Sequence, residues 1–131
     1  MIGTAEIYKV LVANAGIQAL VSKTGTAPNY VYKIQSAVRE PDSWHISDTT
    51  CIVYQSGPDN NAEIYNVNHT VNCRAPTESG AKTLARAVVA ALHRVTFEGV
   101  MFYCTIEQVI PPADNTDNFN APVTVQVVGT K

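Results

Sequence analysis

The chain has 131 residues, a length typical of one compact domain. Its 9 basic and 11 acidic side chains give a formal net charge of −2, and only 15% of the residues are charged while 46% are apolar. These values exclude a disordered tail, which is poorer in apolar residues, and a non-specific nucleic-acid binder, which needs a basic surplus. We therefore expect a single α+β domain over residues 1–131, with a charge-poor surface rich in Val, Thr and Asn.

The sequence predicts neither export nor membrane insertion. No apolar stretch is long enough to span a bilayer, and the first residues lack the basic start and apolar core of a signal peptide. The three cysteines, Cys51, Cys73 and Cys104, have no C-x-x-C spacing and lie in apolar runs predicted as strands. Buried free thiols in a reducing compartment are the simplest interpretation.

The first half of the chain predicts a helix followed by three strands. Thr4 is a suitable N-cap, while Asn14 and Gly16 allow a bend in the helix near Asn14. Residues 22–29 are predicted to be a connector because they contain Gly25 and Pro28. The expected elements are a helix at 4–21, strands at 30–35 and 49–55 around a loop at 39–48, and a third strand at 62–74.

The third predicted strand has the clearest alternation in the sequence. Tyr65, Val67, His69, Val71 and Cys73 are expected to point to one side, and Asn66, Asn68, Thr70, Asn72 and Arg74 to the other. Such a period of two predicts one face on a core and one face against water or a polar partner.

The second half predicts a helix between this strand and two more. Thr77 is the expected N-cap of a helix that runs to about residue 94, with a buried stripe of Ala81, Leu84, Ala85, Val88 and Leu92. Strands at 100–110 and 121–128 flank a polar loop at 113–120. The whole pattern indicates an α+β fold, an antiparallel sheet of four to five strands with the N-terminal and central helices on one face.

Residues that carry catalysis or bind metals are sparse. The three histidines lack a second ligand at metal-binding spacing, and no glycine-rich phosphate loop or nucleophile elbow occurs. Residues 114–119 resemble a calcium loop but lack its glycine and glutamate, and Lys82 with Arg86 is typical of a solvated helix face. We therefore expect no enzyme activity, no cofactor and no metal.

The order of motifs resembles one family. The apolar run Cys51–Gln55 is followed by a Gly-Pro-Asp turn and by a long strand that ends Val71-Asn72-Cys73-Arg74-Ala75. A helix with the run LARAVVAAL, from Leu84 to Leu92, follows directly. With the N-terminal helix, this order resembles the tail terminator (tail completion) proteins of long-tailed bacteriophages over nearly the whole chain.

The resemblance implies a structural virion protein of the tail or neck, assembled in the host cytoplasm. It implies a homo-oligomeric ring, a hexamer in this family, which caps the tail tube, stops its polymerisation and joins it to the head connector. Its implied partners are the major tail tube protein and the head–tail connector proteins, with no membrane and no sequence-specific nucleic acid.

The expected contact surfaces are the polar strand face and the two polar loops, which carry aromatic residues. The residues concerned are Trp44, His45, Asn66, Asn68, Asn72, Arg74, Asp114, Asp117 and Phe119. Two other classes stay open: another small virion assembly protein (neck, head-completion or coat protein) and a small cysteine enzyme or ligand-binding domain.

Overall fold

The structure is a computed structural model that describes residues 4–36, 50–55, 57, 64–97, 99–112 and 118–130. Within these residues the helices are α1 (Thr4–Ala13), α2 (Ala15–Leu20) and α3 (Glu78–Leu92). The strands are β1 (Lys23–Thr24), β2 (Val31–Tyr32), β3 (Ile34–Ser36), β4 (Cys51–Gln55), β5 (Ile64–Ala75), β6 (Thr96–Phe97), β7 (Val100–Ile106) and β8 (Phe119–Thr130).

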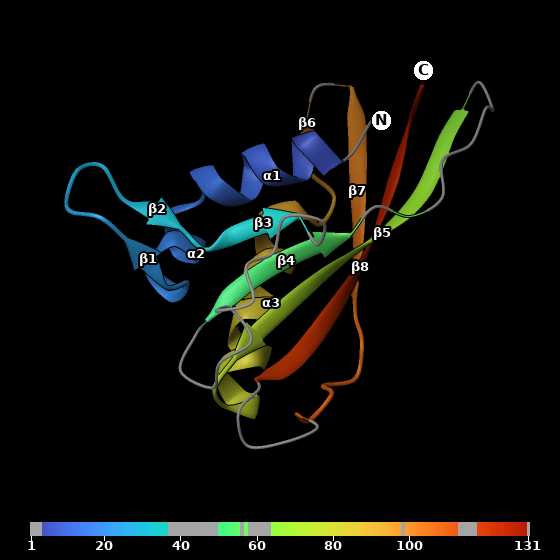
Figure 1. Ribbon diagram of the computed structural model, residues 1–131. Helices are drawn as coiled ribbons and strands as arrows, with labels where there is room; N and C mark the ends of the chain where they lie inside the picture. The colour runs from blue at the N-terminus through green and yellow to red at the C-terminus, as the bar shows by residue number, and fades with distance from the viewer. Residues whose placement is uncertain are drawn as a thin grey trace.

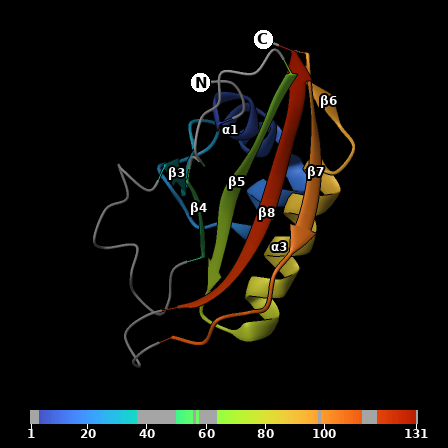
Figure 2. The same ribbon diagram turned by 90° about the vertical axis from the view of Figure 1, so that its right-hand side faces the viewer.

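The main sheet of the described residues has the strand order β3-β4-β5-β8-β7-β6. All three helices lie on one side of it, with α3 along β5, β8 and β7 (Figures 1 and 2). This arrangement confirms the predicted α+β fold. In the described part of the chain, no helix has the length and apolar character needed to cross a membrane.

The sheet is antiparallel except at one end, where β3 runs parallel to β4. The expectation of an antiparallel sheet of four to five strands was therefore wrong in two details, because the main sheet of the described residues has six strands and one parallel pair. Parallel neighbours need a long return connection, and the segment between Ser36 and Thr50 has the length for it. Strand pairing across such a segment is non-local, so the sequence pattern of the two strands did not reveal it.

The predicted connector at 22–29 contains a strand that pattern reasoning missed. Lys23 pairs with Tyr32 and Thr24 with Val31, so β1 and β2 form a small antiparallel hairpin of their own. Gly25 in its turn has a φ of +90°, a conformation that favours glycine. The strand predicted at 30–35 is therefore divided at Lys33 between this hairpin and the main sheet.

The long pair of β5 and β8 forms the centre of the sheet, with twelve paired positions from Ile64↔Thr130 to Ala75↔Phe119. The alternation predicted for β5 is confirmed from Val67 onward, with one exception, because Asn72 on the polar side is only 8% exposed. On the inner side, β5 and β8 bury Val67, His69, Val71, Cys73, Ala121, Val123, Val125 and Val127.

The helices follow the predicted stripes. α3 buries Ala81, Leu84, Ala85, Val88 and Leu92, as expected. The bend near Asn14 separates α1 from α2, because the Asn14 side chain caps the second helix by accepting a hydrogen bond from the Ile17 N–H at 3.0 Å. β7 is shorter than predicted and ends at Ile106, whereas β8 extends beyond both predicted ends.

Thr77 offers a test of the α3 start, because its hydroxyl accepts a hydrogen bond from the Gly80 N–H at 3.0 Å. We expect Thr77→Ala to lower the free energy of unfolding by about 1 kcal/mol. Thr77→Ser keeps the oxygen and should stay close to wild type. Urea denaturation of the three proteins measures both effects, and equal stability of the Ala and Ser variants would contradict the capping role.

Candidate functional site

The side of the sheet opposite the helices carries mostly uncharged polar side chains. Residues directly opposite each other in a ladder share a face, so the register identifies this set. We call its polar members the polar face, namely Asn68, Thr70, Asn72 and Arg74 of β5, Asn120, Thr124 and Gln126 of β8, and Tyr103 and Thr105 of β7. The same register places the apolar Met101, Pro122 and Val128, and the buried Cys51 and Val53 of β4, on this side. Among the nine side chains of the polar face, Arg74 alone carries a charge.

Hydrogen bonds tie the polar face together across three strands. The Asn120 amide donates to Asn72 Oδ1 at 3.1 Å, and the Asn72 amide in turn donates to Gln55 Oε1 on β4 at 3.5 Å. Thr124 Oγ1 donates to Glu107 Oε1 at 3.0 Å, just beyond the end of β7. Because these amides and hydroxyls bond one another, the face is a pre-ordered surface whose remaining polar groups can pair with another molecule.

The structure places part of the predicted contact set on this face. Asn68 is exposed, Arg74 is half-buried and Asn72 is nearly buried, all on the outward side of β5. Asn66 belongs to β5 by its backbone, which pairs with Val128. Trp44, His45, Asp114 and Asp117 lie outside the described residues.

Phe119 differs from its expected place in the polar loop at 113–120. It is the first residue of β8, pairs with Ala75 and packs, half-buried, against the hydrophobic core. Its aromatic ring therefore has a packing role in the fold. A contact of Phe119 with a partner stays a prediction.

The polar face also includes residues that the sequence analysis did not select. Thr124 and Gln126 alternate with the buried Val123, Val125 and Val127, so their side chains lie on the outward side of β8. What the pattern lacked was the neighbour relation, because β5 and β8 are separated by the whole of α3 and β7 in sequence.

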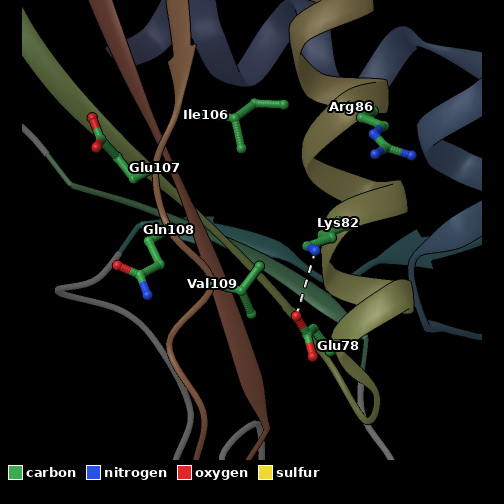
Figure 3. Close-up of a pocket in the computed structure, with 7 residues that line it drawn as sticks. All are labelled: Glu78, Lys82, Arg86, Ile106, Glu107, Gln108 and Val109. Atoms are coloured by element: carbon green, nitrogen blue, oxygen red, sulfur yellow. Dashed lines mark ion pairs between the residues drawn. The ribbon is translucent and has the colours of Figure 1, made fainter.

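A second feature lies at the other side of the sheet, where α3 passes the end of β7. Here a groove of about 430 Å³ runs between the two elements. Figure 3 shows its walls, with Glu78, Lys82 and Arg86 on the helix and Ile106, Glu107, Gln108 and Val109 on the strand side. Lys82 pairs with Glu78 at 3.4 Å, whereas Arg86 makes no ion pair with any described residue.

The cysteines have environments that suppress thiolate formation. Burial raises the pKa of the Cys73 thiol, with a smaller contribution from Cys51, and burial raises the pKa of the half-buried Cys104 to about 11. The described part of the chain brings together no group of three His, Cys, Asp or Glu side chains able to hold a metal ion.

These environments predict slow thiol chemistry. At pH 8 only about one Cys104 in a thousand is a thiolate, so alkylation should be ~200-fold slower than for a free cysteine and should accelerate as the pH approaches 11. Iodoacetamide labelling followed by mass spectrometry measures the rate, with the urea-unfolded chain as control. One rapidly labelled cysteine at pH 7 would contradict this and favour the cysteine-enzyme alternative.

Comparison with known proteins identifies a structural relative. No family model and no curated protein matches the sequence. Among solved structures, a chain of the structure described as "Virion of native gene transfer agent (GTA) particle" is similar, with a TM-score of 0.61 and 18% sequence identity. The match covers 97% of this chain and 93% of that one, so the two chains share their fold over nearly their full lengths.

Proposed function

We propose that this protein is a structural component of a phage-like virion. The observation that supports it most is the full-length fold similarity to a chain of a gene transfer agent virion, at a TM-score of 0.61. The thiols of Cys73 and Cys104, with raised pKa values, lack the character of catalytic nucleophiles. A surface of paired amides and hydroxyls is better suited to contact with other subunits than to catalysis.

Within that class we propose the role of a tail terminator. Copies of the chain would form a ring, a hexamer by the family resemblance, on the last ring of the tail tube. The ring would stop polymerisation of the tube and provide the joint to the head connector. The sequence resemblance through β5 and the LARAVVAAL run of α3 supports this assignment.

The polar face fits a ring in electrostatic terms. In a ring of identical subunits every charge is repeated, so a strongly charged face would repel its own copies and oppose closure. A face with Arg74 as its one charged member avoids this repulsion and still offers hydrogen bonds. We propose that it faces the channel of the ring or a neighbouring assembly in the tail.

The role is tested by deleting the gene for this protein from the genome that encodes the particle. A terminator is required to stop tube growth, so we expect tails of irregular, excessive length that are not attached to heads, seen by electron microscopy. Supplying the wild-type chain in trans should restore normal tails.

The same micrographs separate the alternatives. Tails of normal length with unfilled or unstable heads would contradict the terminator role and indicate a neck or head-completion protein. Particles of normal form and yield would contradict a structural role in the virion altogether.

A further inference from the structure

The exposed large apolar side chains of the described residues gather in two places. Leu20, Tyr30 and Val31 lie in or beside the β1–β2 hairpin, and Val31 is the most exposed of all at 66%. Tyr103, Ile106 and Ile110 lie on β7 and the segment after it, at 39%, 41% and 53%, with Tyr103 on the polar face and Ile106 on the helix side. Tyr8 is the remaining one, and its ring contacts Tyr54. Apolar groups left exposed together in this way mark interaction sites.

The first place is a projection, which we call the arm and define as residues 20–33. Its strands β1 and β2 pair with each other and with no other strand. Its base is fixed, because the Ser22 N–H donates to Thr50 O at 2.8 Å and the Lys33 N–H donates to Ser22 O at 2.9 Å. Figure 1 shows the arm reaching outward beyond β3, at the side of the molecule opposite β7.

The second place is the open half of the β7 edge. Alternate residues of β7 direct their N–H groups away from β8, and the first of these are satisfied within the chain. The Phe102 N–H donates to Val95 O at 3.1 Å, and the Cys104 N–H donates to His93 Nδ1 at 3.0 Å. Ile106 is the next residue whose N–H points away from β8, and this N–H has no partner among the described residues. The edge is therefore open at Ile106, which also lines the groove beside α3.

We propose that the arm of one copy docks into the groove between α3 and the open β7 edge of the next copy. The backbone of the arm would pair with β7 at the open N–H of Ile106, and the Val31 side chain would cover the Ile106 side chain. This inference rests on the proposed ring, and it names the contact that builds it. Because the two surfaces differ and lie at opposite sides of the chain, the contact is heterologous and can repeat head to tail until a ring closes.

The side chains of the two surfaces support a second copy as the occupant. The arm contains Lys23 and Lys33 and no acidic residue. On the strand wall of the groove, the Glu107 carboxylate points to the polar face, where it accepts a hydrogen bond from Thr124 at 3.0 Å (Figure 3). On the helix wall Lys82 is already paired with Glu78, so Arg86 is the basic side chain there that makes no ion pair with a described residue. A guanidinium stacks readily on aromatic rings, and the arm provides Tyr30 and Tyr32. The helix wall of the groove thus meets a matching aromatic group on the arm.

Disulfide trapping between two variants that each carry one introduced, accessible cysteine beside the buried Cys51 and Cys73 tests the contact directly. In a Cys104→Ala background, Val31→Cys and Ile106→Cys are mixed and oxidised, and a covalent heterodimer is expected on a non-reducing gel. A chain with both substitutions should give a ladder that ends at the size of the ring. Thr105→Cys replaces Ile106→Cys in the control, because the adjacent Thr105 points to the polar face.

A charge placed in the contact provides a second measurement. Because Val31 is mostly exposed in the single chain, Val31→Asp should fold normally, and circular dichroism checks this. Loss of a buried Val contact should raise the concentration needed for assembly about tenfold or more, measured by sedimentation. The matched variant Ala5→Asp, at an exposed position on α1 outside the arm, the groove and the polar face, should assemble like wild type.

The outcomes separate this inference from the proposed function. If wild type forms rings while Val31→Asp assembles equally well and no heterodimer is trapped, the arm contact is wrong and the ring stands. If Val31→Cys cross-links mainly to itself, the contact is symmetric and the head-to-tail arrangement is wrong. If wild type stays monomeric at every concentration and nothing is trapped, the ring itself is contradicted.

Discussion

The rest of the structure depends on the antiparallel ladder between β5 and β8. Its twelve paired positions place two long strands side by side with their alternation in phase. Val67, Val71, Val123 and Val127 then fall on one side and build the floor of the core, on which α3 packs. A slip of one position would turn these valines outward and the amides inward, so burial itself fixes the register. The same register that makes the core also makes the polar face.

One polar side chain lies on the core side of this ladder and holds Gly57 beside β5. His69 is 1% exposed, and its Nδ1 accepts a hydrogen bond from the Gly57 N–H at 2.9 Å. An acceptor Nδ1 fixes the neutral tautomer with its proton on Nε2. A Cβ at residue 57 would overlap the carbonyl oxygen of Asn68, so only glycine permits this approach of the backbone to β5. Gly57 and His69 together fasten the end of β4 against the long strand.

How much of this was predictable depends on whether the signal is local. The stripe of α3, its Thr77 cap and the alternation of β5 are written within short windows of sequence, and all three were predicted correctly. The parallel pairing of β3 with β4 and the pairing of β1 with β2 depend on partners that short windows do not specify. For the same reason the sequence identified the β5 side of the polar face, Asn68 and Asn72, but missed Thr124 and Gln126 beside them and the groove beside α3.

The two ends of the main sheet are unlike, and this asymmetry bears on assembly. At one end β7 is covered by β6 and by His93 over its first half and is open at Ile106. At the other end stands the short β3, with the arm projecting beside it. An exposed edge with apolar side chains invites pairing with another chain. Pairing of like ends would cover one apolar group per molecule and leave the other in water. Pairing of unlike ends covers both and leaves the polar face free along the whole assembly, and with a closing rotation it yields a ring.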